Sequence, residues 1–229
     1  MFVSVIIAAA GNSTRYGTGN SKQFLLLEGV PVLIKSVQAF EQIDEVKEII
    51  ITARKQDFDV IEGFLQQYNI KKVKSVVEGG ATRQDSIAAA VKKVSEETEI
   101  IAVHDGARPL VSKETIIGVI EKAVEKGAAA CAVPVKDTIK IIDSSGKIVT
   151  TPDRVSLRAV QTPQVFDFAL YKEAIDKAVS ESKQYTDDCQ LIESMGHPVY
   201  LTDGDYENIK ITTPDDLLVA EKFLSERRK

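Results

Sequence analysis

Short apolar runs alternate with longer segments of helical periodicity along most of this chain. The apolar runs occupy residues 2–7, 48–52, 73–77, 100–103 and 128–135. Between them, apolar side chains recur every three or four residues, as they do on one face of a helix. Strands that alternate with helices form a largely parallel sheet with helices packed against it. The 229 residues suit one such domain, so we expect a single α/β domain over residues 1–229.

Capping residues predict where several helices begin and end. Ser112 is suited to be the N-cap of a helix that runs to Lys126, and Gly127 is expected to end that helix. Pro214 is expected at the first position of the last helix, where proline is favoured. These boundaries support the alternation of helices and strands.

The pattern changes after Asp137. Residues 138–142 and 147–151 flank a turn of polar residues and glycine, which predicts a β-hairpin with no neighbouring helix. A lone two-stranded hairpin is marginal in water, so we expect it to pack against other structure. A second copy of the chain is the simplest candidate, and the alternative is an arm folded back on its own domain.

The remaining segments give shorter patterns. We expect residues 154–166 to return irregularly to the domain and residues 170–178 to form a helix. Thr186, Asp187 and Asp188 are expected to cap a further helix that runs through Met195 and ends at Gly196. Residues 199–201 and 208–211 are interpreted as short strands.

A turn of small residues follows the first apolar run. Residues 8–17 read A-A-A-G-N-S-T-R-Y-G and lead on to S-K-Q-F. Small side chains let backbone N–H groups approach and cradle phosphate oxygens. Arg15 and Lys22 add two cations to the same segment, so its chemistry suits a polyphosphate. The alternative is a surface loop with two solvated charges.

Three turns of small or polar residues follow three of the predicted strands. The first is the segment at 8–17, the second contains Gly79 and Gly80, and the third contains Asp105. Ligands of open α/β sheets bind outside the carboxyl ends of the strands. We therefore expect the three turns to meet in one crevice, where Asp105 is able to hold Mg²⁺ against a triphosphate. The alternative role of Asp105 is to cap a turn.

Composition narrows the function further. The net charge of −5 argues against nucleic-acid binding by bulk electrostatics. Cys131 and Cys189 form no C-x-x-C pair, so neither a disulfide framework nor a zinc site is expected. No signal peptide is expected and no apolar stretch is long enough to span a membrane, which predicts a cytoplasmic protein. Of the two histidines, His104 is expected to be a turn or core residue rather than an acid–base catalyst.

Several motifs occur in the order typical of one enzyme family. They are A-A-G-N-S-T-R-Y-G with S-K-Q-F, G-G-A-T-R-Q-D-S, V-H-D-G-A-R-P, A-V-P-V-K-D-T-I-K, T-P-D-R, Q-T-P-Q-V-F, T-D-D and N-I-K-I-T-T-P-D-D-L. The ordered set resembles the 2-C-methyl-D-erythritol 4-phosphate cytidylyltransferases of non-mevalonate isoprenoid synthesis, over nearly the whole chain. Ser13 stands where the family usually has glycine, and Gly106 stands where alanine is common, but serine, glycine and alanine are all small. The ribitol-5-phosphate cytidylyltransferases share the first loop and are the alternative, although Q-T-P-Q and N-I-K-I-T-T-P look more like the methylerythritol enzymes.

The resemblance implies a Rossmann-like three-layer nucleotidyltransferase fold with a mostly parallel sheet. It also implies a protruding β-arm, at about residues 137–160, through which two copies form a homodimer. The implied reaction transfers a cytidylyl group from CTP to 2-C-methyl-D-erythritol 4-phosphate, with Mg²⁺, and gives 4-diphosphocytidyl-2-C-methyl-D-erythritol and pyrophosphate. An alternative of another class is a non-catalytic nucleotide-binding module on the same scaffold.

The resemblance also implies roles for individual residues. Arg15 and Lys22 match the residues that stabilise the transition state. The residues implied in CTP binding are Ala9, Ala10, Gly11, Gly80, Arg83, Ser86, Asp105 and Ala107, with Asp105 also next to the metal. The residues implied to position the second substrate are Arg154, Lys210, Arg108, Thr138 and Thr186. Arg154 is implied to reach into the partner's site, and Arg83 either contacts the nucleotide or only braces its loop.

Overall fold

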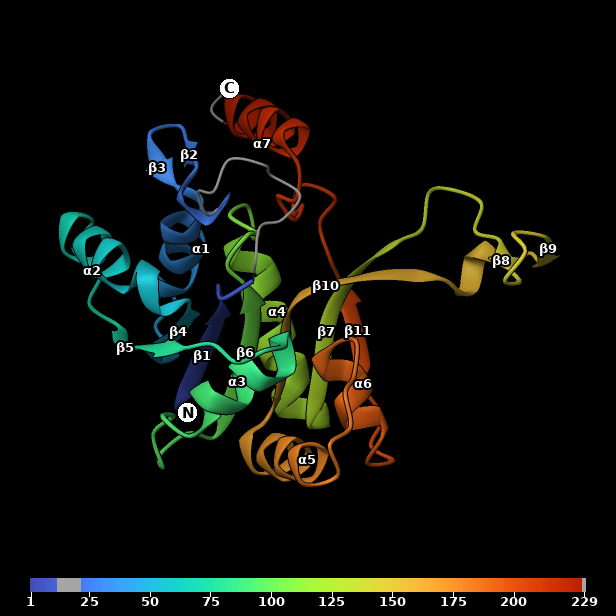
Figure 1. The fold of residues 1–229 in the computed structure, drawn as a ribbon, viewed down its shortest axis with the longest axis horizontal. Helices are drawn as coiled ribbons and strands as arrows, with labels where there is room; N and C mark the ends of the chain where they lie inside the picture. The colour runs from blue at the N-terminus through green and yellow to red at the C-terminus, as the bar shows by residue number, and fades with distance from the viewer. Residues whose placement is uncertain (12–21, 228–229) are drawn as a thin grey trace.

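The computed structural model describes residues 1–11 and 22–227. Its centre is a seven-stranded sheet in the order β11-β7-β10-β6-β1-β4-β5 (Figure 1). The strands are β1 (Val3–Ala8), β4 (Val46–Ala53), β5 (Val73–Glu78), β6 (Ile100–Asp105), β7 (Ala128–Pro134), β10 (Arg158–Asp167) and β11 (Tyr200–Asp203). Within this sheet only β10 runs antiparallel to its neighbours, β6 and β7. The predicted α/β fold with a mostly parallel sheet is confirmed.

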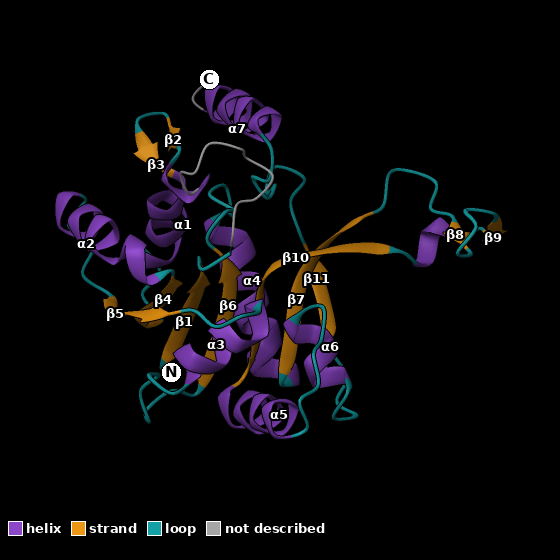
Figure 2. Ribbon diagram, viewed as in Figure 1, coloured by secondary structure: helices purple, strands orange, loops and turns teal. Residues whose placement is uncertain are grey.

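Helices cover both faces of the sheet (Figure 2). One layer holds α1 (Val32–Glu41), α2 (Phe58–Gln67) and α4 (Lys113–Lys126), and the other holds α3 (Arg83–Val91), α5 (Phe168–Ser180) and α6 (Asp188–Glu193). Val3, Val5 and Ile7 of β1 pack with the first layer, whereas Ile6 packs with the second. Successive side chains of a strand point to opposite faces, and here both faces are covered. This burial explains why the strands appear as continuous apolar runs in the sequence.

The helix boundaries predicted from capping residues are confirmed. Ser112 Oγ accepts a hydrogen bond from the backbone N–H of Thr115 at the start of α4, and Gly127 ends that helix at φ 85°. A left-handed φ suits glycine because it has no Cβ to clash. The last helix, α7 (Pro214–Arg227), begins at Pro214 as predicted. None of the described helices is long and apolar enough to cross a membrane.

A third apolar cluster lies beside the edge of the sheet where the parallel strands end. A small hairpin, β2 (Leu26–Leu27) with β3 (Val30–Pro31), shares this cluster with α7 (Figure 1). Leu27, Ile211 and Ala220 are buried in it. The cluster fixes the C-terminal helix next to the β2–β3 hairpin and the segment that follows β11.

The prediction of an irregular return over residues 154–166 is wrong. Only the 3-10 helix η4 (Arg154–Ser156) and its neighbours are irregular, and β10 then runs through the sheet between β6 and β7. Proline cannot donate a ladder hydrogen bond, so Pro163 hides this strand in the sequence. In the structure the pairing of β10 with β7 is interrupted between Val160 and Gln164, which accommodates the proline.

The prediction of a strand at residues 208–211 is also wrong, whereas the strand predicted at 199–201 is confirmed as β11. The alternating letters N-I-K-I match a strand, but this segment forms no ladder. It is held by separate contacts instead. The side-chain amide of Asn208 donates to the carbonyl of Thr162, and the N–H of Ile211 donates to the carbonyl of Ala107.

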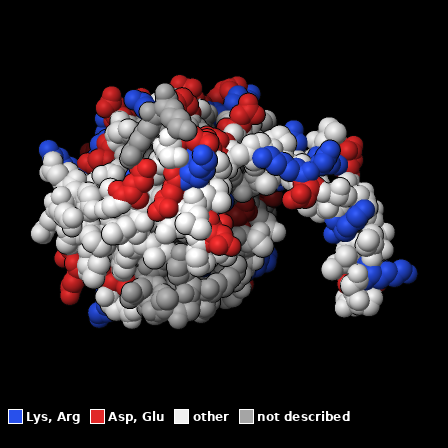
Figure 3. Space-filling view, turned by 90° about the horizontal axis from the view of Figure 1, so that it is seen from above, with Lys and Arg blue, Asp and Glu red and all other residues white. Residues whose placement is uncertain are grey.

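The predicted hairpin projects from the body as an arm (Figures 1 and 3). Its paired strands, β8 (Ile141–Ile142) and β9 (Ile148–Thr150), are shorter than predicted. The side chains of Ile142, Ile148 and Val149 are 58%, 55% and 62% exposed. The arm therefore does not fold back on its own domain, and it presents apolar side chains that the described part of the chain leaves uncovered.

Candidate active site

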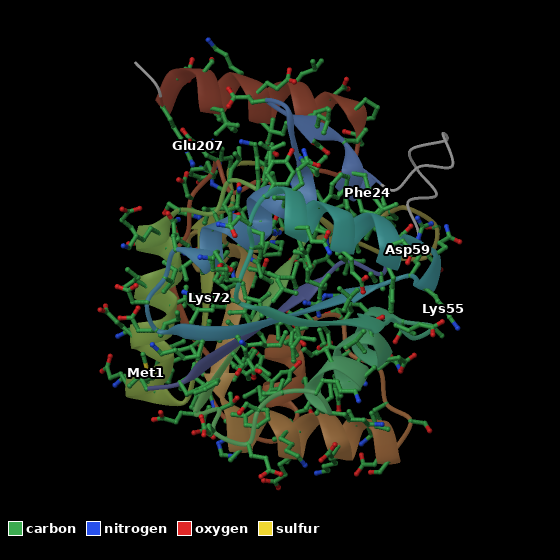
Figure 4. The ribbon with its side chains drawn as sticks, turned by 90° about the vertical axis from the view of Figure 1, so that its left-hand side faces the viewer. Met1, Phe24, Lys55, Asp59, Lys72 and Glu207 are labelled. Carbon is green, nitrogen blue, oxygen red and sulfur yellow. The ribbon has the colours of Figure 1, made fainter. Side chains whose placement is uncertain are left out.

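A cavity of about 500 Å³ opens where four parallel strands end. Gly11 follows β1, Lys55 follows β4, Gly79 follows β5 and Asp105 ends β6, and all four line the cavity. Figure 4 shows Lys55 at the opposite end of the strands from Met1, which precedes β1. The chain passes from β1 to β4 and β5 on one side, and β6 lies on the other side of β1. A switch point of this kind is where open α/β sheets bind ligands.

Asp105 is the carboxylate on which three cations converge. Its Oδ2 lies 2.7 Å from Nζ of Lys210 and 3.6 Å from Nε of Arg108, and its Oδ1 lies 3.6 Å from Nε of Arg83. Burial alone would raise the pKa of Asp105, but the cations, Lys210 foremost, hold that pKa well below its ordinary value. The carboxylate is therefore ionised. Arg83 also pairs with Asp188, so three positive charges face two carboxylates, and the remaining positive charge suits an anionic ligand.

The backbone of Asp105 is fixed by β10. The N–H of Asp105 donates to Oγ1 of Thr162 at 3.1 Å, and the same hydroxyl lies 3.0 Å from Nδ1 of His104. Nε2 of His104 lies 3.1 Å from the carbonyl of Arg108, and because a carbonyl only accepts, Nε2 carries the proton. His104 is fully buried, and burial lowers its pKa from 6.5 to about 4. The prediction that His104 is a core residue is confirmed.

Arg83, the first residue of α3, bridges two carboxylates. Its Nη1 lies 2.6 Å from Oδ2 of Asp188, while its Nε faces Asp105. Asp188 is buried and accepts a 2.6 Å hydrogen bond from the hydroxyl of Tyr171. Arg83 also lines the cavity. The guanidinium therefore braces the site from inside, and its contact with a nucleotide stays a prediction.

The turn after β5 is held by the start of α3. Ser86 Oγ accepts a hydrogen bond from the N–H of Gly80 at 3.0 Å and donates to the carbonyl of Thr82 at 2.8 Å. Thr82 closes the helix start with a reciprocal capping box. A Cβ on Gly79 would collide with the Cβ of Ala10, so glycine is what lets this turn approach the loop after β1. The predicted meeting of these two turns is confirmed.

The structure brings together most of the residues predicted to bind CTP. Those that line the cavity are Ala10, Gly11, Gly80, Arg83, Ser86, Asp105 and Ala107. Ala9 is buried, and its N–H donates to the carbonyl of Thr52 at 2.9 Å, so it serves the sheet. Arg15 lies outside the described residues. Lys22 begins the 3-10 helix η2 (Lys22–Phe24), but its side chain is likewise outside what the structure describes.

The residues predicted for the second substrate divide between the cavity and other surfaces. Lys210 lines the cavity, and Arg108 lies beside Asp105. Arg154 and Thr138 are exposed residues of the arm, which projects away from the body (Figure 1). Thr186 is exposed just before α6. A single chain therefore does not bring Arg154 into its own cavity.

Several residues that line or brace the cavity were not predicted from the sequence, among them Lys55 and Asp188. Lys55 lines the cavity, and its place two residues after the end of β4 is the signal that would have indicated it. Asp188 is predicted only as part of a helix cap, yet it pairs with Arg83. No local pattern indicates this pair, because the two residues are far apart in the sequence.

The cavity fits a metal ion only as part of a phosphate complex. Among the described residues, no group of three His, Cys, Asp or Glu side chains is arranged to hold a metal ion. Asp105 is a single carboxylate, and one of its oxygens already faces Lys210. Mg²⁺ is commonly bound by one or two carboxylates together with substrate phosphates. This donor set suits Mg²⁺ that arrives on a triphosphate.

Comparison with known proteins establishes the family. A family model described as 2-C-methyl-D-erythritol 4-phosphate cytidylyltransferase matches residues 3–226. The chain belongs to this family. Two relatives with that name, from Caldanaerobacter subterraneus subsp. tengcongensis and Bacillus cytotoxicus, are 47% and 45% identical to it. The matches cover 98% and 99% of this chain, and 99% of each relative.

A solved structure supports the assignment of the chain to this family. The 4-diphosphocytidyl-2C-methyl-D-erythritol synthase from Anaerococcus prevotii superposes with a TM-score of 0.88 at 33% identity. The superposition covers 98% of this chain and 96% of the other. The predicted resemblance to the methylerythritol family is confirmed.

Proposed function

We propose that this cytidylyltransferase transfers a cytidylyl group from CTP to 2-C-methyl-D-erythritol 4-phosphate and releases pyrophosphate. The proposal rests on one observation: in a chain that matches this family, Asp105 and three cations cluster beside a cavity of about 500 Å³. That volume lies within the usual range of small-molecule sites. The position, outside the ends of β1 and β6, is where α/β sheets bind nucleotides.

CTP takes the part of the cavity between the loop after β1 and the turn after β5. The small residues Ala10 and Gly11 let phosphate oxygens come close to the backbone. The base lies against the segment of Gly80 and Ser86, whose hydrogen bonds hold it rigidly. A narrow, fixed turn favours a pyrimidine over a purine, because the larger base would collide with it.

The reaction joins two anions. An oxygen of the methylerythritol phosphate forms a bond to the α-phosphorus of CTP, and the bond from that phosphorus to the bridging oxygen of pyrophosphate breaks. The attacking phosphate is already ionised near neutral pH, so no general base is needed. Arg15 and Lys22 stabilise the charge that develops on the transferred phosphoryl group, and positioning supplies the rest of the catalysis.

Asp105 and Lys210 prepare the cavity for the two phosphates. Asp105 would hold a Mg²⁺ ion that arrives on the triphosphate, and the ion would neutralise part of the triphosphate charge. Lys210, which pairs with Asp105, is placed to attract the phosphate of the second substrate. Arg108 adds positive charge from behind Asp105.

The second substrate's pocket is completed by the partner in a homodimer. Arg154 and Thr138 lie on the projecting arm, outside their own cavity, and the arm's apolar side chains are exposed. An exposed apolar surface of this kind suits association with a second copy. In this arrangement Arg154 enters the partner's site, where Thr186 and Lys210 are its neighbours.

Substitution of Lys22 tests the assignment of the reacting centre. Lys22→Ala is expected to lower kcat by about 10²–10³, because a preorganised cation is lost. Pyrophosphate release from CTP with methylerythritol phosphate measures this loss. Lys47→Ala is the matched control, since Lys47 lies at the start of β4, away from the carboxyl ends of the strands where the cavity lies, and should keep wild-type turnover. Near-normal turnover by Lys22→Ala would remove Lys22 from the catalytic machinery.

A further inference from the structure

Lys210 stands on a loop that has no regular secondary structure. The loop joins β11 to α7, over residues 204–213. A lysine side chain has four rotatable bonds, so the place of its ammonium depends on how firmly its backbone is held. The contacts that fix this loop therefore decide where the cation stands.

Asn208, two residues before Lys210, supplies the central contacts. It is fully buried, and its Nδ2 donates to the carbonyl of Thr162 at 2.9 Å and to Oε1 of Gln161 at 3.3 Å. The backbone carbonyl of Asn208 accepts a 2.6 Å hydrogen bond from Nη1 of Arg108. Asn208 thereby ties the loop to β10 on one side and to the turn after β6 on the other.

Two of these partners, Thr162 and Arg108, also hold Asp105. The hydroxyl of Thr162 accepts the N–H of Asp105, and the guanidinium of Arg108 lies 3.6 Å from the Asp105 carboxylate. Each partner therefore contacts Asn208 with one group and Asp105 with another. This arrangement sets the distance between the two segments that carry Asp105 and Lys210.

We propose that Asn208 is a positioning residue that holds Lys210 in register with Asp105, and so places the phosphate of the second substrate. The inference rests on the proposed function, because it takes Lys210 as the residue that attracts that phosphate. Asn208 itself is fully buried and is not among the residues that line the cavity. Its loss should weaken binding of the polyol phosphate and leave the nucleotide subsite unchanged.

Two substitutions of Asn208 test the proposal. Asn208→Ala removes the amide, and Asn208→Asp keeps the size but replaces the donor with an acceptor that faces the carbonyl of Thr162. Each is expected to raise KM for the polyol phosphate about tenfold, the effect of one lost buried hydrogen bond, with KM for CTP within about twofold. Ser4→Ala is the matched control, because it loses a buried hydrogen bond to Glu48 and lies away from the carboxyl ends of the strands.

A double-mutant cycle separates positioning from a general loss of stability. In the Lys210→Ala background, Asn208→Ala should change KM for the polyol phosphate by less than about twofold, since the residue acts through Lys210. Additive effects, or an equal rise in KM for CTP, would overturn the proposal. If the Asn208 variants do not fold, Gln161→Met removes one of the same contacts from the β10 side, and the same outcomes decide.

The proposed function and this inference fail in different ways. If wild-type protein gives no pyrophosphate from CTP and 2-C-methyl-D-erythritol 4-phosphate, the proposed function is wrong. If the wild type is active and the Asn208 variants keep their KM values, only the inference is wrong.

Discussion

The charge on Asp105 is set by residues from three separate parts of the chain. Lys210 comes from the loop after β11, Arg83 from the start of α3 and Arg108 from the turn after β6. Together they hold the pKa of Asp105 below its ordinary value despite burial. The carboxylate therefore stays ionised throughout the neutral range, and a change of activity there must arise from other groups.

His104 gives the protein a stability that depends on pH. Its pKa is about 4 in the folded chain, because burial disfavours the charged ring, and about 6.5 in an unfolded chain. Between these values the unfolded state binds a proton that the folded state does not. The free energy of unfolding should therefore fall as the pH drops from 6.5 towards 4, by up to about 1.4 kcal/mol per pH unit from this residue.

Urea unfolding at several pH values measures this slope. His104→Gln should remove the contribution of one proton over that range, whatever its effect on absolute stability. His197→Gln is the control, because His197 is the other histidine of the chain and is exposed. An unchanged slope in His104→Gln would show that the buried ring does not govern the acid sensitivity.

Sequence reasoning reached the residues of the site that belong to recognisable motifs. Asp105, Lys210 and the Gly80 turn follow predicted strands or match family motifs, and the structure gathers them. It did not give roles to Asp188 or Asn208. Both act through contacts with residues distant in the sequence, Arg83 and Thr162, and no local periodicity encodes such a contact.

At the scale of elements, local signals predicted the helices and parallel strands well. Apolar runs marked strands buried on both faces, and caps such as Ser112 marked helix ends. β10 was missed because Pro163 interrupts its pattern, and its antiparallel direction depends on the path of the arm. The alternating pattern of residues 208–211 predicts a strand, but alternation alone does not reveal whether a pairing partner exists.

The approach of the turn after β5 to the loop after β1 gives a prediction about elements. Gly79→Ala places a Cβ against Ala10 and Ser86, so one of the two turns must shift. We expect a loss of about 1–3 kcal/mol in unfolding free energy and a higher KM for CTP. Urea unfolding and steady-state kinetics measure the two effects.

Gly118→Ala is the matched control for that substitution. Gly118 lies inside α4, and a Cβ there meets no atom within 4 Å. Alanine in a helix interior should stabilise the chain by about 0.5–1 kcal/mol and leave the kinetics unchanged. If Gly79→Ala behaved like Gly118→Ala, the close approach of the two turns would not matter for the site.

At the scale of the molecule, the arm decides whether one chain is sufficient. Arg154 lies in η4 on the projecting arm and is not among the described residues that line the cavity, so the proposed site needs a partner's arm (Figure 3). An Arg154→Ala chain co-expressed with a Lys22→Ala chain should form mixed dimers. In each mixed dimer one site is intact and the other lacks both residues.

The mixed preparation should regain about a quarter of wild-type activity. Random pairing makes about half of the dimers mixed, and each mixed dimer carries one intact site out of two. Each variant alone should stay inactive, which is the control. Activity that does not return on mixing would mean that Arg154 does not serve a partner's site.

The identity of the second substrate tests the central claim most directly. Purified protein would be given CTP and Mg²⁺ with either 2-C-methyl-D-erythritol 4-phosphate or ribitol 5-phosphate, and pyrophosphate and the cytidine diphosphate product would be quantified. The account predicts equal amounts of pyrophosphate and 4-diphosphocytidyl-2-C-methyl-D-erythritol from the first, and little product from the second. Faster turnover of ribitol 5-phosphate, or no turnover of either, would contradict it.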